Sequence, residues 1–376
     1  MTPPVRATID LRAISDNLAA MRAHLGGLPL LAAVKANAYG HGAVEVSRHL
    51  QESGAAEQLG VATVAEGIQL RQAGITLPIL KLSHCLPDEL DEAIGAGLAL
   101  TVVDESTLRA CSRSATALGR EVAVHLKLDS GMGRIGAPLD QGVALASLAQ
   151  RLPGVDLVGV FTHLPVADAG DDQGYTDAEL RAFERVSDAI MAAVGPLPWV
   201  HAANSGAILG HDLTGHTLAR PGIAMYGYYP DHTTPRTVPL RQALQLSTRV
   251  AFIKDVAAGT SIGYGRTWTA EHPTRIATLP IGYADGFSRL NSNRGQVLVN
   301  GRRVPVVGRV CMDQTMIDLG PEGHDAVGDE VTVLGGDPAR GAAGFIGTDE
   351  VADLMGTISY EVTCLIAARV PRHYVG

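Results

Sequence analysis

Residues 98–129 read LALTVVDESTLRACSRSATALGREVAVHLKLD: an apolar run, a helix-like stretch and a second apolar run. The middle stretch opens with the acidic Glu105 and closes on Gly119, which are the residue types that the helix dipole and a left-handed cap favour at these ends. Apolar runs that alternate with helical patterns are typical of a parallel sheet with crossover helices. The stretch therefore predicts a strand, a helix and a second strand parallel to the first.

The same unit recurs through more than half of the chain. Eight apolar runs qualify as strands, at residues 30–35, 59–65, 78–84, 98–104, 122–129, 157–163, 199–205 and 218–227. Helix-like stretches lie between most of them. Eight βα units predict an α/β fold with a closed, TIM-like (β/α)8 barrel. An open doubly wound sheet is the alternative that the pattern leaves open.

The pattern changes at residues 226–239, YGYYPDHTTPRTVP, whose prolines indicate a linker. The sequence that follows reads mostly as strands. Within residues 296–308, QVLVNGRRVPVVG, an Asn-Gly pair stands between alternating apolar residues, which is the strongest short-range signal of a hairpin. We expect a barrel over residues 10–232 and a mostly β domain over 237–376, which the N-terminal strand within 1–9 joins.

Composition favours a small-molecule partner. The chain has 376 residues and a formal net charge of -9, so it offers no basic field to nucleic acid or to an anionic membrane. Its four cysteines lie at wide spacings without a CxxC pair, which indicates neither a disulfide framework nor a zinc site. The N-terminus has no export signal, and no apolar segment is long enough to span a bilayer. We expect a cytoplasmic protein without a metal.

The strand at 122–129 carries ionisable side chains on one face. Its valines and leucines point to one side, whereas His125, Lys127 and Asp129 point to the other. Catalytic residues of barrel enzymes lie at the C-terminal ends of the strands, so these residues are candidates for a site at the barrel centre. A structural ion network that fills the barrel is the alternative for His125 and Asp129.

Residues 131–136, GMGRIG, match the dinucleotide fingerprint G-x-G-x-x-G and follow a strand. That fingerprint requires a helix that begins on the glycines. Here Pro138 follows, and the helical pattern starts only near Asp140. We therefore reject a dinucleotide site and interpret the segment as a catalytic or anion-binding loop that carries Arg134.

Nine motifs, in order along nearly the whole chain, resemble the alanine racemase family. They are AVKANAYGHG, HLKLDSGMGRIG, THL, HAANSG, RPGIAMYG, GYGRTWTA, PIGYADGFSR, GRVCMDQTMID and SYEVTCLIAARVPR. The resemblance implies an enzyme that uses pyridoxal 5′-phosphate and has an N-terminal barrel and a C-terminal β domain. This fold agrees with the separate count of βα units.

The resemblance also implies which residues move the proton. Lys35 matches the lysine that bonds to the aldehyde of the cofactor and then serves as one acid/base group. Tyr264 matches the second group, on the other face of the substrate α-carbon. His163 matches a residue between Tyr264 and Arg220, and Arg220 matches the arginine that faces the pyridine nitrogen. The family usually has serine where this chain has Gly263, and a glycine there loosens the backbone.

Further residues match the family's contacts with cofactor and substrate. Besides Lys35, His163 and Arg220, the matches to the cofactor site are Tyr39, Arg134, Asn204, Ser205, Gly222, Ile223 and Tyr360. The matches to the substrate site are Arg134, Met312, Tyr283 and Asp313. Taken singly, each of these residues also has an ordinary structural explanation, such as a helix cap, a turn or a rim ion pair.

Lys127 matches a lysine that the family carboxylates with carbon dioxide. The modification turns a cation beside Arg134 into an anion that holds this arginine. An unmodified Lys127 paired with Asp129 or another acid is the alternative.

The implied reaction is the interconversion of L- and D-alanine, which supplies D-alanine for peptidoglycan, in a homodimer with shared active sites. A serine or broad-specificity racemase is the nearest alternative. A non-catalytic pyridoxal phosphate carrier would need Lys35 and the phosphate contacts but would lack the β domain. A decarboxylase is disfavoured by the match at Arg220, because decarboxylation benefits from a protonated pyridine ring.

Overall fold

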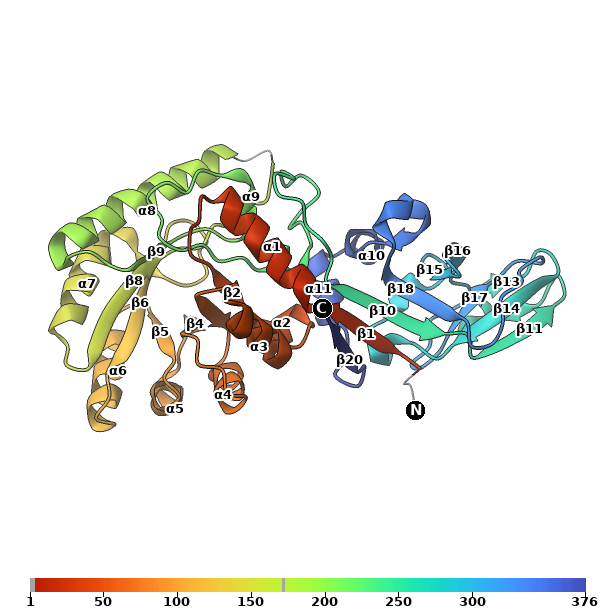
Figure 1. Ribbon diagram of the computed structural model, residues 1–376, viewed down its shortest axis with the longest axis horizontal. Coiled ribbons are helices and arrows are strands. Elements are labelled where there is room, and N and C mark those ends of the chain that lie inside the picture. The colour runs from red at the N-terminus through yellow and green to blue at the C-terminus, as the bar shows by residue number, and fades with distance from the viewer. Residues whose placement is uncertain (1–3, 171–172) are drawn as a thin grey trace. The chain divides into compact units, whose positions relative to one another are not determined.

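The chain forms two compact units (Figure 1). The structure, a computed structural model, describes residues 4–170 and 173–376. One unit comprises residues 14–241, and the other comprises residues up to Ala13 together with 242–376. The first is a barrel and the second is mostly β, so the predicted fold class is confirmed. Over the described residues, no helix has the length and apolar character needed to cross a membrane.

The barrel unit is built on one curled parallel sheet, whose strands follow one another in sequence order (Figure 1). The strands are β2 (Leu31–Ala33), β3 (Gln58–Val61), β4 (Ile79–His84), β5 (Ala99–Val102), β6 (Val122–Asp129), β8 (Val155–Phe161) and β9 (Trp199–His201). A short strand, β7 (Ala137–Pro138), pairs only with the end of β6.

An irregular eighth segment, residues 217–221, closes this sheet. On one side the N–H of Thr217 donates to the carbonyl of Val200 (2.9 Å). On the other side the N–H of Leu31 donates to the carbonyl of Ala219 (2.8 Å). The barrel is therefore closed, and the open doubly wound sheet is excluded.

The predicted strand at 218–227 is wrong in its second half. Pro221 has no N–H with which to continue the ladder, and the chain turns into the 3-10 helix η3 (Ile223–Tyr226). The same stretch of sequence thus closes the barrel and then leaves it, which brings Gly222 to the barrel mouth.

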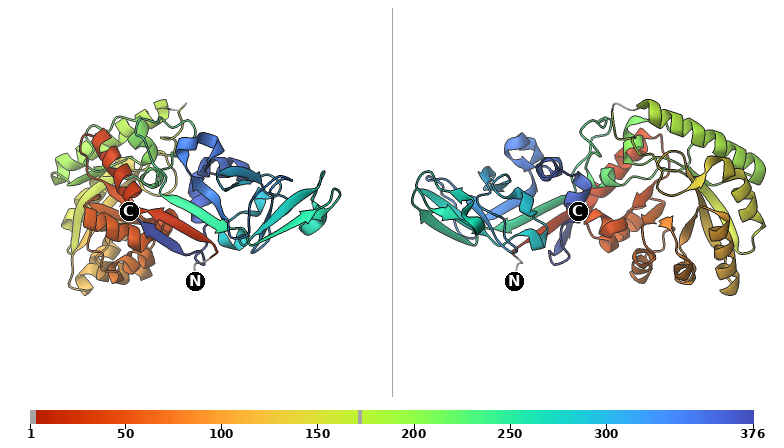
Figure 2. Two further views of the ribbon diagram at one scale, coloured as in Figure 1. Left: turned by 45° about the vertical axis from the view of Figure 1, so that its right-hand side comes forward. Right: turned by 180° about the vertical axis from the view of Figure 1, so that it is seen from behind.

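Helices cover the outside of the barrel sheet (Figure 2). They are α1 (Leu11–His24), α3 (Ala43–Ser53), α4 (Val64–Gln72), α5 (Leu90–Gly95), α6 (Glu105–Ala117), α7 (Gly142–Arg151), α8 (Gln173–Val194) and α9 (Ser205–Gly210), with the 3-10 turns η1 (Pro87–Glu89) and η2 (Leu139–Gln141). Because α7 starts only at Gly142, the glycines of the GMGRIG segment open no helix, as predicted.

The barrel interior changes from apolar to ionisable along the strands. Leu31, Leu80 and Leu218 form a buried cluster. Farther along its strand, His125 is buried in register with Gly159 of β8. A Cβ at Gly159 would lie 2.5 Å from His125 Nδ1, so this layer requires a glycine beside the imidazole.

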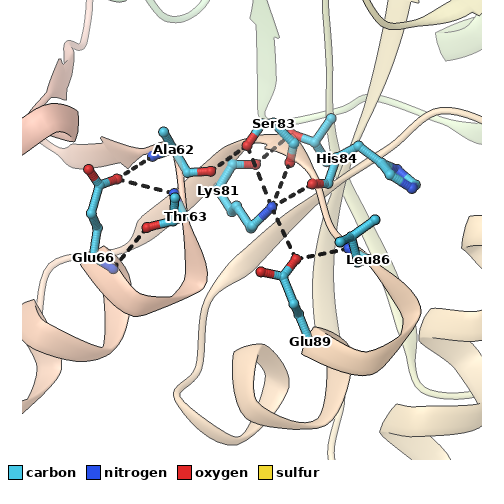
Figure 3. A network of polar contacts seen from close by, with 9 residues as sticks. Ala62, Thr63, Glu66, Lys81, Ser83, His84, Leu86 and Glu89 are labelled. Carbon is cyan, nitrogen blue, oxygen red and sulfur yellow. Dashed lines mark hydrogen bonds and ion pairs between the residues drawn. The ribbon is translucent and has the colours of Figure 1, made fainter.

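A buried lysine supports the C-terminal end of β4 (Figure 3). Lys81 Nζ donates to the carbonyl of His84 (2.5 Å) and lies 3.8 Å from Glu89 Oε2. The hydroxyl of Ser83 donates to the carbonyl of Ala62, in the segment that follows β3. The segment after β3 is thereby joined to the C-terminal end of β4.

The β unit contains two larger sheets and one strand pair. Its main sheet has the order β16 (Arg302–Pro305), β15 (Gln296–Val299), β18 (Glu330–Gly336), β10 (Leu244–Arg249), β1 (Arg6–Asp10), β20 (Arg372–Val375), with β19 (Phe345–Ile346) beside β18. The others are β11 (Phe252–Val256), β14 (Thr274–Leu279), β17 (Thr315–Asp318), and the pair β12 (Ser261–Ile262), β13 (Trp268–Thr269). The helical elements are α10 (Thr348–Met355), α11 (Ser359–Cys364), η4 (Tyr264–Arg266), η5 (Tyr283–Asp285), η6 (Arg289–Asn291) and η7 (Pro338–Ala343).

Two features of this unit come directly from the sequence. The strand β1 is antiparallel to β10 and parallel to β20, so it is paired on both sides within the main sheet. The predicted hairpin is confirmed between β15 and β16. Its turn residues, Asn300 (φ 50°) and Gly301 (φ 73°), both have the positive φ of a type I′ turn.

Candidate active site

The chain makes a left-handed turn directly after β2. In the segment labelled α2 (Lys35–Tyr39), Ala36, Asn37, Ala38 and Tyr39 have φ of 52° to 54°. Each non-glycine residue in this conformation costs about 1–2 kcal/mol. Four in succession persist only where surrounding contacts hold them, and such strain concentrates at functional sites.

Those contacts come from both sides of the turn. Glu66 accepts the N–H of Ala36 at Oε1 (2.7 Å), while its Oε2 accepts the N–H of Thr63 (3.1 Å) in the capping box of α4 (Figure 3). The Asn37 side chain accepts the N–H of Ala43 (2.9 Å). Glu66 was missed by sequence reasoning, although the TVAE signature at 63–66 marks it as a capping residue.

A buried histidine supports the far end of the turn. His41 Nδ1 lies 3.0 Å from the carbonyl oxygens of both Ala38 and Tyr39. Its ring stacks on Tyr226 at a centroid distance of 4.3 Å. The turn thus fixes where the side chains of Lys35 and Tyr39 leave the backbone.

The Tyr39 hydroxyl meets the start of η3 and α9. A Cβ at Gly222 would lie 2.8 Å from Tyr39 Oη, so any larger residue at this position would displace the tyrosine hydroxyl. Ser205 Oγ accepts the N–H groups of Gly222 (2.9 Å) and Ala224 (3.2 Å). Asn204, the N-cap of α9, accepts the N–H of Ala207 (3.0 Å). The structure therefore brings Tyr39, Ser205 and Gly222 together, with Asn204 and Ile223 next in the chain.

Arg220 lies at the buried centre of the barrel, where it donates mainly to carbonyl groups. Nη1 donates to the His201 carbonyl (3.0 Å), and Nη2 donates to the carbonyls of Thr162 (2.7 Å) and Ala202 (2.8 Å). Among the described residues, Nε has no acceptor. Burial lowers the pKa of Arg220 to about 9, so the guanidinium remains charged at neutral pH.

Because a guanidinium can only donate, Arg220 determines the tautomers of the histidines around it. It donates to Nδ1 of His201 (2.8 Å) and of His163 (3.3 Å), which assigns the proton of each ring to Nε2. His201 Nε2 then donates to His125 Nδ1 (3.0 Å). His163 Nε2 remains a donor.

These imidazoles are neutral. Burial first, and then the charge of Arg220, lower the pKa of His125 to about 3 and that of His163 to about 2. The ion network considered as an alternative for His125 is therefore wrong. Asp129 forms no ion pair among the described residues, and its Oδ1 accepts the N–H groups of Gly131 (3.1 Å) and Gly133 (3.0 Å) in the loop that carries Arg134.

Lys127 is a buried amine among cations. Its side chain is 4% exposed, and its Nζ lies 5.3 Å from the centroid of the Phe161 ring. Burial first, followed by the charges of Arg220 and Arg134, lower the pKa of Lys127 to about 7. No carboxylate of the described residues forms an ion pair with Lys127, so the alternative pairing with Asp129 is not observed.

The remaining predicted residues lie on the β unit. Tyr264, Tyr283 and Met312 are exposed by 72%, 42% and 53%. Tyr360, in α11, is half-buried, and Asp313 is exposed. These residues thus lie in a different unit from Lys35.

Gly263 has a conformational reason to be a glycine. Its φ is 74° and its ψ is -176°, a region that only glycine occupies readily. A Cβ at this position would also lie 2.9 Å from Met316 Cε. In this chain the glycine suits the backbone that presents Tyr264.

Within the described residues, no group of three or more His, Cys, Asp or Glu side chains is arranged to hold a metal ion. The barrel places Lys35 at the start of a turn that ends at Tyr39, whose hydroxyl lies near Gly222, two residues after the buried guanidinium of Arg220.

Comparisons with known proteins place the chain in a family. Residues 9–230 match the family model "Alanine racemase, N-terminal domain", and residues 243–374 match "Alanine racemase, C-terminal domain". An alanine racemase of Cutibacterium acnes is 50% identical over 99% of this chain and 98% of its own length. The solved alanine racemase of Clostridium difficile 630 is 37% identical, with a TM-score of 0.91 over 100% of this chain and 96% of that chain. The enzyme from D-cycloserine-producing Streptomyces lavendulae is also 37% identical, with a TM-score of 0.91 over 100% and 98% of the chains.

A pair of Ala→Gly substitutions tests whether the turn is strained. Ala36 and Ala19 are both exposed, but Ala36 has φ 52°, whereas Ala19 lies in right-handed α1. We expect Ala36→Gly to raise the free energy of unfolding by up to about 1 kcal/mol, because relief of strain exceeds the entropy cost of glycine. Ala19→Gly should lower it by about 1 kcal/mol. Urea unfolding of the cofactor-free protein measures both, and equal losses would contradict the strained turn.

Proposed function

Because this chain belongs to the alanine racemase family, we propose that it interconverts L- and D-alanine with pyridoxal 5′-phosphate and two acid/base groups, Lys35 and Tyr264. Members of this family are isomerases that act on amino acids, and this chain is such an enzyme. The observation that carries the proposal is the left-handed turn, since it sets the amine of Lys35 and the hydroxyl of Tyr39 on the same short segment beside Gly222.

The barrel residues fit the cofactor. The phosphate fits the hydroxyls of Tyr39 and Ser205 and the N–H groups at Gly222 and Ile223, where a Cβ on Gly222 would fill the space. Tyr360 and Asn204 complete this set. Lys35 supplies the amine for the aldehyde, and the open Nε–H of Arg220 suits the pyridine nitrogen. When bound, the cofactor makes the α-hydrogen of an attached amino acid acidic.

Arg220 limits the range of reactions that the bound cofactor would support. A guanidinium donates a hydrogen bond to the ring nitrogen but does not give up its proton. The nitrogen therefore stays unprotonated, and the ring withdraws less electron density from the α-carbon. Rapid return of the proton to the α-carbon is then favoured over longer sequences such as transamination. A racemase needs only that proton exchange.

Lys35 and Tyr264 exchange the proton on opposite faces of the α-carbon. Lys35 Nζ removes or returns it on one face, and Tyr264 Oη does so on the other. A free tyrosine is a poor acid at neutral pH. His163 assists, because its Nε2–H can donate to the phenolate oxygen while Arg220 fixes its tautomer, and a donor to an anion stabilises that anion.

Arg134 and the N–H of Met312 bind the substrate carboxylate in this proposal, with Tyr283 and Asp313 at the entrance. A guanidinium fork matches a carboxylate in geometry and charge. Bulk near the α-carbon favours the methyl group of alanine. A serine or broad-specificity racemase remains the second candidate, since a hydroxymethyl group is only slightly larger.

Lys127 is proposed to carry a carboxyl group on its Nζ. The neutral amine attacks carbon dioxide, a C–N bond forms and a proton is released, which leaves an anion. The supporting observation is a buried amine with a pKa near neutrality that faces the charges of Arg220 and Arg134 without an acid partner among the described residues. Carboxylation would replace the repulsion between Lys127 and the two arginines with an attraction.

The exposed positions of Tyr264, Tyr283 and Met312 support a homodimer in which the β unit of one subunit completes the barrel site of the other. A pyridoxal phosphate carrier built on a barrel alone would lack these residues. The D-alanine formed would enter peptidoglycan precursors in the cytoplasm.

The purified protein with pyridoxal 5′-phosphate should convert L-alanine to D-alanine. Lys35→Ala should abolish both this conversion and the visible absorbance of the covalently attached cofactor. Lys254→Ala, which removes an exposed amine in β11, should change neither. Chiral chromatography with L-serine in parallel measures the preference, and equal or faster turnover of serine would refute the assignment to alanine.

Mixing two inactive variants tests the shared site. Lys35→Ala and Tyr264→Phe should each be inactive, but a hybrid dimer contains one doubly damaged site and one intact site. If chains pair at random from an equal mixture, about a quarter of the sites should be fully wild-type. Co-expression with two affinity tags isolates the hybrid. An inactive hybrid would place both residues in the site of one chain.

Carboxylation of Lys127 should depend on pH in a defined direction. The amine is neutral above its pKa of about 7, so the modification should be complete above that pH and decline as the pH falls below it. Native mass spectrometry in bicarbonate should find one added carbon dioxide, which Lys127→Ala removes. Acetate should partly restore the activity of Lys127→Ala, and an active wild-type enzyme with a free Lys127 amine would refute the modification.

A further inference from the structure

Arg369 connects two loops of the β unit through two carboxylates. It lies between α11 and β20, where its Nε donates to Asp285 Oδ1 (2.7 Å) and its Nη2 donates to Asp313 Oδ1 (2.7 Å). The carboxylate of Asp285 is 8% exposed and that of Asp313 is 60% exposed. A planar guanidinium presents its donors in fixed directions, so the contact sets the relative position of both acids.

The buried Asp285 depends on this contact. Its Oδ2 accepts the N–H of Gly282 (2.9 Å), and its main-chain carbonyl accepts the N–H of Ala367 (3.2 Å). Among the described residues, Arg369 is the sole donor to Oδ1. A buried carboxylate requires donors and a compensating charge, and Arg369 supplies both.

The loop of Asp285 and the loop of Met312 fit together closely. The N–H of Ala284 donates to the carbonyl of Met312 (3.0 Å). A Cβ at Gly282 would lie 2.3 Å from the carbonyl oxygen of Cys311 and 2.4 Å from that of Met312. Because no free space separates the two backbones, a displacement of Asp285 moves Met312.

We propose that Arg369 is a positioning residue that holds Met312 and Tyr283 in place for the substrate carboxylate, by fixing Asp285 and Asp313. This inference rests on the proposed function, which assigns the Met312 N–H to that carboxylate. Arg369 acts through the two loops. Its loss should therefore weaken the binding of any carboxylate at this subsite.

The β unit contains a matched ion pair that serves as a control. Arg302 lies 2.7 Å from Asp325, and the two side chains are 49% and 6% exposed, against 47% and 8% for Arg369 and Asp285. Arg302 belongs to β16, away from the sequence of both loops. Arg302→Gln therefore removes a comparable ion pair from the same unit without touching the Met312 loop.

The experiment compares Arg369→Gln, Arg302→Gln and the wild type. Both variants should lose thermal stability to a similar extent. In the holoenzyme, only Arg369→Gln should raise the KM for alanine and the inhibition constant of propanoate, each about tenfold and with a smaller change in kcat. Hydrogen–deuterium exchange without substrate should accelerate at residues 282–287 and 311–313 in this variant alone.

A second variant keeps the test decisive if Arg369→Gln does not fold. Asp313→Asn retains the buried pair with Asp285, so it should melt like the wild type and still raise both constants by a smaller factor. Wild-type exchange and KM in Arg369→Gln, wild-type KM in Asp313→Asn, or shifts in Arg302→Gln equal to those in Arg369→Gln would overturn the proposal. If the wild type does not racemise alanine, the proposed function fails, whereas the exchange measurement still decides whether Arg369 holds the two loops.

Discussion

A single buried guanidinium, acting together with burial, favours the neutral form of the groups around it at the barrel centre. Arg220 is held by the carbonyl groups of Thr162, His201 and Ala202, so dipoles stabilise its charge and no carboxylate of the described residues neutralises it. The unbalanced charge acts on its surroundings. It orients His163 and His201 as acceptors, and it contributes, after burial, to the depressed pKa of Lys127 and of the histidines. Neutral imidazoles and an amine with a pKa of about 7, placed beside a permanent cation, are suited to chemistry that moves protons repeatedly over short distances.

The other constraint is mechanical. The left-handed residues after Lys35 are individually unfavourable, and their conformation is held by Glu66 at one end and His41 at the other. Glu66 also caps α4, whose preceding segment is joined through Ser83 to the loop that Lys81 supports (Figure 3). The position of the lysine thus depends on the loops after β3 and β4 as well as on its own strand. A side chain that reacts with one particular atom, as proposed for Lys35, requires rigid support of this kind.

The sequence could predict the elements that local pattern determines. Eight apolar runs gave the barrel, and Asn300–Gly301 gave the hairpin, because strand length and turn chemistry are local properties. The handedness of the turn after Lys35 was not predictable, since Ala36 and Ala38 favour a right-handed helix and only distant contacts reverse that preference. The second half of the expected strand at 218–227 differs for a similar reason, because the chain leaves the barrel after Pro221 and forms η3 instead. The resemblance to the family predicts a special role for Lys127. Only the structure shows that Lys127 lies near Arg220 and Arg134 and forms no ion pair with an acid among the described residues.

Comparison of Arg220 with Arg369 explains why two arginines of the same chain have different effects. Arg369 contacts two carboxylates, which compensate its charge directly. Its electrostatic effect on more distant groups is therefore small. It can therefore serve as a geometric link even though it is half exposed to solvent. Arg220 faces carbonyl dipoles in a buried site, where the effective dielectric constant is lower and the net charge persists. The type of acceptor thus explains the different roles of the two arginines. The carboxylates make Arg369 a positional link, whereas the carbonyl groups leave Arg220 as a source of electrostatic potential. An anion formed on Lys127 would place a compensating charge beside Arg134 and would leave the Nε–H of Arg220 free to face the pyridine nitrogen.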